Sequence, residues 1–171
     1  MQKKFTTKTL VISALLAALS VILRLLGFPQ DGTFRIELGF IPIAVSGYLY
    51  GGIISGITYV IADIIGTLFT GMSPFFPITV CKFLMGVIYG LFFYKGNKSL
   101  KNIIFCTLVI AVLIDLVFMP FALLPISGSK TFWGILMTRI IATGFNVPLR
   151  IVSLYVTFKY LSFDGIKEKR G

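Results

Sequence analysis

The chain has 171 residues, of which 57% are hydrophobic and only 13% are charged, and its mean hydropathy is +0.96. About a quarter of the residues of an ordinary soluble domain are charged, so this composition excludes that class and indicates an integral membrane protein. At about 20 residues per span, the chain has room for six helices and little else. We therefore expect an all-α membrane protein with one domain, over residues 1–171.

The apolar runs predict six membrane helices. A basic start precedes the first run, which continues without a small-residue cleavage site, so we expect a retained first helix rather than a signal peptide. The second run is too short to cross without tilt or irregular backbone. We expect the fifth helix to break at Pro120 and the sixth to contain Pro148. The predicted ranges are 7–26, 37–50, 53–70, 77–94, 102–124 and 131–161.

Basic residues gather on one side of this predicted bundle, while Arg35 and Lys130 alone stand in loops on the other side. Because basic loops stay in the cytoplasm, we expect both termini to be cytoplasmic and the loops after helices one, three and five to meet outside. The formal charge of +10 therefore reports topology, and no nucleic acid partner is implied. The ten residues on the cytoplasmic side are Lys3, Lys4, Lys8, Lys95, Lys98, Lys101, Lys159, Lys167, Lys169 and Arg170.

Cysteine and histidine usage argues against metal and disulfide chemistry. Cys81 and Cys106 lie inside apolar runs without partner spacing, so we expect two small buried hydrophobic side chains. Histidine is absent, which removes the commonest general base and metal ligand. We expect no cofactor.

The stretch 34–42 places two opposite charges at the start of an apolar run that Pro42 then interrupts. Charge at a membrane segment is expensive and usually functional, and proline frees backbone groups that need a new partner. We expect this stretch to form the outer lip of a ligand pocket. Its candidate ligand-binding residues are Phe34, Arg35, Glu37 and Gly39.

Six ionisable residues lie within the predicted spans: Arg24, Asp63, Lys82, Asp115, Arg139 and Arg150. Four cations cannot be neutralised by two carboxylates, and unpaired charge in an apolar medium is costly, so an anionic ligand is a natural complement. The alternative is that Asp63 and Asp115 form structural pairs with two of the cations, while Arg24 and Arg150 extend toward the membrane surface.

Helical position narrows this set. Arg24, Lys82 and Arg139 share a depth in the outer half, and Asn146 has nearly the angular position of Arg139. Together with Asp63, these are the candidate ligand-binding residues of the spans. Arg150 continues the stripe toward the cytoplasm and is expected to be structural or to take part in coupling.

Aromatic residues are predicted at or near the outer end of the bundle, where a planar heteroaromatic ligand can stack. For Phe132 and Trp133 the alternative is an interfacial aromatic belt. Phe75 and Phe76 stand between two prolines and are expected to form a rigid lid. The cluster consists of Phe34, Phe40, Tyr48, Phe75, Phe76 and Trp133.

Ala14 and Ala18 are four residues apart in the first helix. Small residues at this spacing let another helix approach closely in lipid. Arg24 lies about 80 to 120° around the helix from them, so one helix can face a ligand on one side and a partner on the other.

These residues resemble the S-components, the substrate-binding membrane subunits of energy-coupling factor (ECF) vitamin transporters, and most closely the folate-binding group. The resemblance rests on Ala14 and Ala18 followed by Arg24, on the lip, on Asp63 and on the stretch 74–77. It implies a six-helix subunit of the bacterial cell membrane, without enzymatic activity, that binds vitamin beneath the outer loops.

The resemblance further implies partners. The alanines of the first helix would contact a transmembrane coupling subunit that carries two ATPases, and the subunit would topple in the bilayer to release its ligand inside. Folate fits the residues, since its pterin suits the aromatics and its glutamate suits the cations. S-components for riboflavin or thiamine remain an alternative.

An intramembrane enzyme is the rival from another class, because Asp63, Asp115 and Lys82 could support acid–base chemistry. The sequence contains no nucleophile with a partnered base and no metal-ligand cluster. It also contains no Walker motif, so the chain cannot energise transport alone.

Overall fold

A computed structural model describes residues 7–26, 38–71, 73–94, 99–126 and 131–160, and the regular structure of these residues is helical. Five segments are long and apolar enough to cross a membrane, namely α1, α3, α4, the continuous rod α5–η1–α6, and α7, whereas α2 is short. The elements are α1 Thr7–Leu26, α2 Phe40–Tyr50, α3 Gly52–Phe69, α4 Phe76–Phe93, α5 Leu100–Val109, the π-helix η1 Ile110–Phe118, α6 Met119–Leu123 and α7 Phe132–Tyr160.

The predicted helix ranges agree with these elements within a few residues at their described ends, with one correction in the fifth. The predicted break at Pro120 is wrong, because the chain stays helical from Leu100 to Leu123. Pro120 has no N–H to donate, and in a straight α-helix its ring would clash with the carbonyl four residues earlier. The wider π turns that precede it, in which the N–H of Met119 donates to the carbonyl of Ile114, relieve this conflict.

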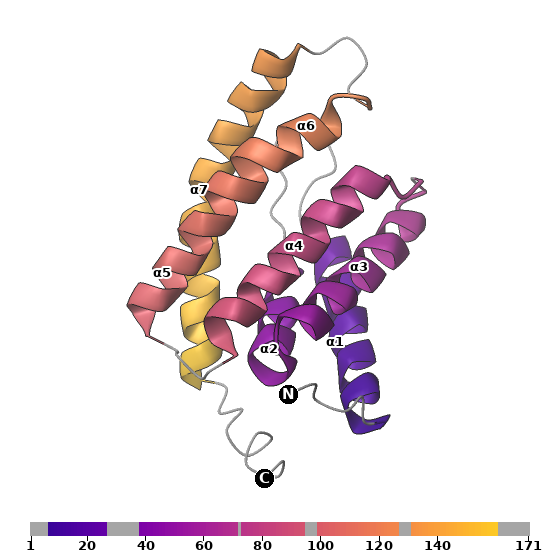
Figure 1. Cartoon of the computed structure of the whole chain (residues 1–171), viewed down its shortest axis with the longest axis vertical. Coiled ribbons are helices and arrows are strands. Elements are labelled where there is room, and N and C mark those ends of the chain that lie inside the picture. The colour runs from indigo at the N-terminus through magenta and orange to yellow at the C-terminus, as the bar shows by residue number, and fades with distance from the viewer. Residues whose placement is uncertain (1–6, 27–37, 72, 95–98, 127–130, 161–171) are drawn as a thin grey trace.

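The helices form two groups (Figure 1). Helices α1 to α4 lie along one side of the molecule, and the α5–η1–α6 rod lies beside α7 along the other. Helices α3 and α4 pack backbone to backbone through glycines. A Cβ atom on Gly86 would lie 2.7 Å from the Cα of Gly56, and one on Gly90 would overlap the backbone of Gly52. Small residues permit this approach in lipid, where apolar side chains alone provide little drive for association.

Helix α2 is the buried link between the groups. All of its residues except Ile41 are buried, and it turns sharply into α3 at Gly51, whose φ of 90° favours glycine. Tyr48, near the end of α2, packs against Phe158 of α7 with ring centroids 5.7 Å apart. The short helix therefore supports the core without needing to span a bilayer.

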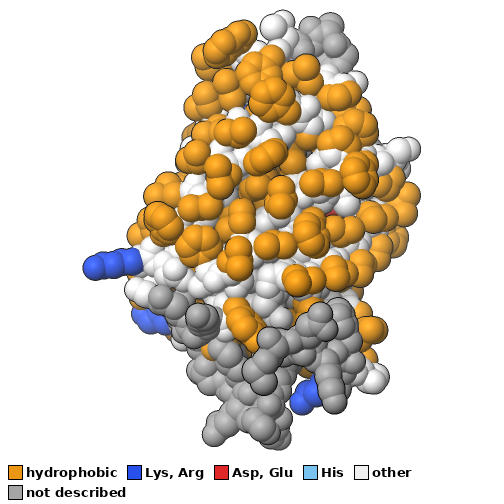
Figure 2. All heavy atoms as spheres, viewed as in Figure 1, with side chains coloured by type: hydrophobic (Ala, Val, Ile, Leu, Met, Phe, Trp, Pro, Cys, Tyr) orange, Lys and Arg blue, Asp and Glu red, His pale blue; other side chains and the backbone are white. Residues whose placement is uncertain are grey.

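The outer surface suits lipid. Figure 2 shows a face covered by apolar side chains, with the basic side chains visible on it confined to the lower end. Among the described residues, Lys8, Lys101 and Lys159 stand at the start of α1, the start of α5 and the end of α7. The start of α1 and the end of α7 lie at this same lower end (Figure 1). The chain is a multi-pass membrane protein.

Candidate functional site

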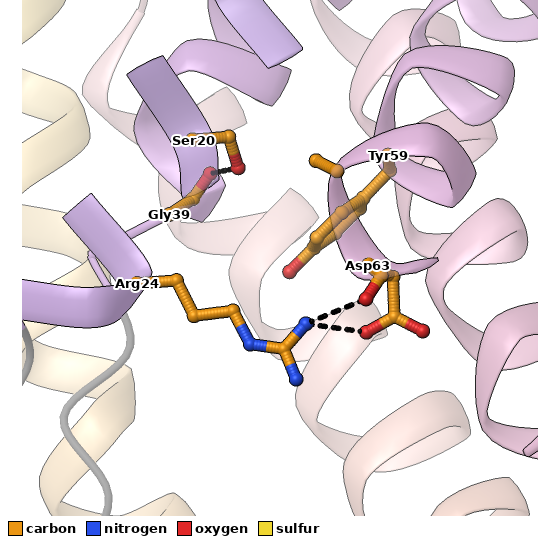
Figure 3. A pocket seen from close by; sticks show the side chains of 6 residues that line it. Ser20, Arg24, Gly39, Tyr59 and Asp63 are labelled. Carbon is orange, nitrogen blue, oxygen red and sulfur yellow. Dashed lines mark hydrogen bonds and ion pairs between the residues drawn. The ribbon is translucent and has the colours of Figure 1, made fainter. Parts of the chain in front are cut away.

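An ion pair joins α1 to α3 near the upper end of α1, two residues before Leu26. Arg24 Nη1 lies 2.8 Å from Asp63 Oδ1, with the two side chains 14% and 4% exposed. Nη1 also donates to the Asp63 carbonyl at 3.2 Å, and Nη2 donates to Thr67 Oγ1 at 3.1 Å. Figure 3 shows the guanidinium directed at Asp63. Arg24 is therefore held by three acceptors on one helix face.

Helix α4 completes this cluster. Thr79 Oγ1 donates to Asp63 Oδ2 at 3.3 Å. Lys82 is buried, with its Nζ 3.4 Å from the hydroxyl of Tyr59 and 5.1 Å from the centre of that ring. The amino group of Lys82 thus lies inside the bundle against the hydroxyl and the ring of Tyr59. We call the set the upper polar cluster: Arg24, Tyr59, Asp63, Thr67, Thr79 and Lys82.

The local sequence explains the geometry of the cluster. Tyr59, Asp63 and Thr67 are four residues apart and therefore share one face of α3. Gly66 leaves room for the guanidinium, since a Cβ atom there would lie 3.2 Å from Arg24 Cδ. Close by, Ser20 Oγ donates to the carbonyl of Gly39 at 2.6 Å, which anchors the start of α2 to α1 (Figure 3). A small cleft is lined by Ser20, Arg24, Gly39, Tyr59, Ala62 and Asp63.

A second ion pair joins η1 to α7. Arg150 Nη1 lies 3.2 Å from Asp115 Oδ2, and the Arg150 guanidinium carbon lies 5.5 Å from the centre of the Phe40 ring. Asp63 and Asp115 thus each form an ion pair within the protein, as the structural alternative in the sequence analysis predicts. The expectation that Arg24 and Arg150 extend toward the membrane surface is wrong, because these two arginines are the cations paired with Asp63 and Asp115.

The other two cations of the spans stay in the interior. Lys82 contacts Tyr59, and half-buried Arg139 makes no ion pair with any carboxylate of the described residues. The described spans contain four cations (Arg24, Lys82, Arg139, Arg150) and two carboxylates (Asp63, Asp115), which is an excess of two positive charges.

The remaining predicted ligand-binding residues are dispersed. Gly39 precedes α2, while half-buried Asn146 lies two turns below Arg139 on α7. Phe75 is half-buried before α4, whereas Phe76 is 79% exposed on the outer surface. Phe34, Arg35 and Glu37 lie outside the described residues.

Tyr48 requires a correction. The prediction placed it in the outer aromatic cluster, but its ring is 2% exposed and packs against Phe158, two residues before the end of α7. The reason is the direction of α2, which carries the chain away from the upper polar cluster over its 11 residues. Tyr48 is therefore a core residue of the lower half.

Sequence reasoning left Tyr59, Thr67 and Thr79 out of the site. The spacing of four residues between Tyr59, Asp63 and Thr67 could have identified Tyr59 and Thr67, since polar side chains on one face of a membrane helix require a partner. Thr79 carries no such signal. Among the described residues, no group of three or more His, Cys, Asp or Glu side chains is arranged to hold a metal.

Ala14 and Ala18 lie on a different surface. Both are exposed, and they line an apolar groove between α1 and α3 with a volume of about 540 Å³. Ile54, Ile57 and Ile61 form its opposite wall. Arg24 lies about 80 to 120° around α1 from the two alanines, and it lines the cleft but not the groove.

Three comparisons bear on this arrangement. Residues 8–165 match the family model described as the ECF transporter, substrate-specific component. The chain is 30% identical over 141 residues to the folate transporter FolT of Clostridium novyi (strain NT). These aligned residues make up 82% of this chain and 81% of that protein. It is also similar to a crystal structure of FolT bound with folic acid, with a TM-score of 0.82 and 27% identity, over 92% of this chain and 96% of that chain.

Proposed function

Since the chain belongs to the family of substrate-specific components of ECF transporters, we propose that it captures folate at the outer face of the bacterial cell membrane for ATP-driven uptake. Two relatives support folate in particular: a folate transporter at 30% identity and a FolT structure that contains folic acid. The chain itself acts as a binding subunit and not as an enzyme.

The observation that carries the proposal is the excess of two cations in the described spans. The described spans contain four buried or half-buried cations and two carboxylates, and a surplus of positive charge in an apolar interior favours an anionic ligand. Folate has two carboxylates on its glutamate, so a bound folate would neutralise the excess. Riboflavin has no carboxylate, and thiamine is itself a cation, so neither provides this compensation.

The residues divide into two roles under this proposal. The glutamate is assigned to Arg139, which forms no ion pair with Asp63 or Asp115, and to Lys82, which is buried beside Tyr59. Arg24 and Asp63 hold α1 against α3 and shape the cleft beside Gly39. Asn146, Phe75 and the lip residues Phe34, Arg35 and Glu37 remain proposed ligand contacts.

The second part of the proposal concerns the coupling partner. The groove lined by Ala14 and Ala18 is apolar and open along α1 and α3, so a helix of a transmembrane coupling subunit can approach the α1 backbone there. That subunit would carry two ATPases. The basic residues at the lower end, Lys8, Lys101 and Lys159, support a cytoplasmic position for this end by the positive-inside rule.

Equilibrium dialysis of labelled folate against the purified chain, without ATP, tests the function. The expected result is saturable binding, with all of the folate recovered unchanged. Recovery of an altered ligand would indicate an enzyme. Tight binding of riboflavin or thiamine without any binding of folate would retain the family and refute the substrate.

A further inference from the structure

The cleft beside Arg24 is small and polar. Its volume is about 10 Å³, which is about the space that one water molecule requires. Pockets for organic ligands usually measure about 300–1,000 Å³, so the cleft is too small to hold a vitamin. Its polar side chains are those of Ser20, Arg24, Tyr59 and Asp63. The cleft therefore suits a small polar occupant.

One donor of Arg24 lacks a hydrogen bond within the described part of the chain. Nη1 donates to the carbonyl and the carboxylate of Asp63, and Nη2 donates to Thr67. The Nε atom is buried, and no described residue accepts its hydrogen. A buried donor on a charged group is costly to leave without a hydrogen bond, and buried polar groups are almost always satisfied. The Nε–H of Arg24 thus requires a further acceptor.

The other polar groups of the cleft can bond the same occupant. Ser20 Oγ donates its hydrogen to the carbonyl of Gly39 at 2.6 Å, and its lone pairs can still accept. The Tyr59 hydroxyl can donate or accept, and Lys82 Nζ, 3.4 Å away, can only donate to it. Figure 3 shows the Tyr59 hydroxyl and the Arg24 guanidinium directed into the same region. An occupant that both accepts and donates would match these groups.

The charges around the cleft favour a neutral occupant. The Asp63 carboxylate lines the cleft and would repel an anion, whereas the Arg24 guanidinium would repel a cation. A water molecule is neutral, accepts two hydrogen bonds and donates two. Buried waters typically make about three hydrogen bonds to polar groups of the protein, and four polar side chains line this cleft.

We propose that the cleft binds one ordered water molecule that joins Arg24 to Tyr59. The water accepts from Arg24 Nε and bonds the Tyr59 hydroxyl. Its remaining hydrogen goes to Ser20 Oγ or to Asp63. The ion pair between α1 and α3 and the contact of Tyr59 with Lys82 then belong to one hydrogen-bonded network, which spans α1, α3 and α4. This inference goes beyond the proposed function and does not depend on the identity of the transported ligand.

A high-resolution crystal structure of the purified chain, grown in sodium bromide, tests the occupant directly. We expect one spherical density peak at about 2.5–3.2 Å from Arg24 Nε and from the Tyr59 oxygen, without anomalous signal from bromide. A bromide signal in the cleft would show an anion site, and an ordered cleft without a peak would show that the cleft is dry. Either result would overturn the inference.

A double-mutant cycle tests the bridge in solution. Arg24→Lys keeps a cation beside Asp63 but has no Nε–H donor, and Tyr59→Phe keeps the ring but has no hydroxyl. Each single variant should melt at a lower temperature than the wild type. Because both changes break the same network, the loss in the double variant should be smaller than the sum of the two single losses.

Tyr59→Phe combined with Thr157→Val is the control cycle. Thr157 Oγ donates to the carbonyl of Ser153 within α7, and Thr157 is not among the residues that line the cleft, so these two losses should add. Additive losses for Arg24→Lys and Tyr59→Phe would overturn the bridge. The crystal structure of the wild-type chain decides the inference if one of the variants does not fold.

Discussion

Arg24 of α1 and Asp63 of α3 form an ion pair 2.8 Å long, although 39 positions separate them in the chain. The pair lies beside the cleft that reaches Gly39, while Ala14 and Ala18, about 80 to 120° around α1, line the apolar groove. The first helix thus has an inner face fixed by charge and an outer face that is apolar and open.

Removing one partner of this ion pair should lower the free energy of unfolding more than removing both partners does. Arg24→Leu leaves a buried carboxylate without its cation, and Asp63→Leu leaves a buried guanidinium, so each should lower stability by about 3–5 kcal/mol. The double leucine variant removes both charges and should be more stable than either single variant. Thermal unfolding in detergent measures all three, and a double variant whose loss equals the sum of the single losses would show that the pair is not coupled.

The contact between α3 and α4 should not tolerate a methyl group. A Cβ atom at Gly90 overlaps the backbone of Gly52, so Gly90→Ala should force the helices apart and lower stability by about 1–3 kcal/mol or more. Gly144→Ala is the matched control, because a Cβ atom there meets nothing within 4 Å, and it should stay within about 0.5 kcal/mol of wild type. Equal melting temperatures for the two variants would contradict the packing described.

Much of the fold was predictable because the apolar runs have the length of membrane spans. The predicted range 7–26 coincides with α1, and the end of the predicted second helix coincides with Tyr50. The continuity through Pro120 was not predictable, because hydropathy carries no information on the π turns that accommodate the proline. The direction of α2, and with it the position of Tyr48, depends on packing between distant segments.

The charged residues of the site were predictable as a set, but their pairing was not. A charge within a span indicates that a partner exists, and the sequence therefore identified Arg24, Asp63, Asp115 and Arg150. Which cation meets which carboxylate depends on the rotation and depth of each helix. The pairing of Asp115 with Arg150 additionally depends on the π-helix, for which no signal was recognised in the sequence.

Lys82 and Arg139 should both contribute to folate affinity. Lys82→Gln and Arg139→Gln should each weaken the binding of folate by about 1.5–3 kcal/mol, the usual value of a hydrogen bond to a charged group. Lys101→Gln, an exposed position at the lower end, should leave the affinity unchanged. Calorimetric titration of the three purified variants measures this, and equal affinities for all three would refute the placement of the glutamate.

The groove on α1 should determine coupling and not binding. Replacing Ala14 and Ala18 together by Trp fills the groove and should abolish co-purification with the coupling subunit and ATP-driven uptake, while folate binding is retained. Leu15→Trp with Leu19→Trp is the matched control, since both leucines are exposed on α1 outside the groove. Loss of folate binding in the alanine variant, or retained uptake, would contradict the partner surface.

Folate binding by the isolated chain is the most direct test of the central claim. In calorimetric titration of the purified wild-type protein without ATP, we expect saturable binding of one folate per chain that an excess of riboflavin or thiamine does not displace. The charge excess predicts, in addition, that the Lys82→Gln and Arg139→Gln double variant loses most of this affinity. No binding of folate by a folded wild-type chain, or full affinity in the double variant, would contradict the proposed site.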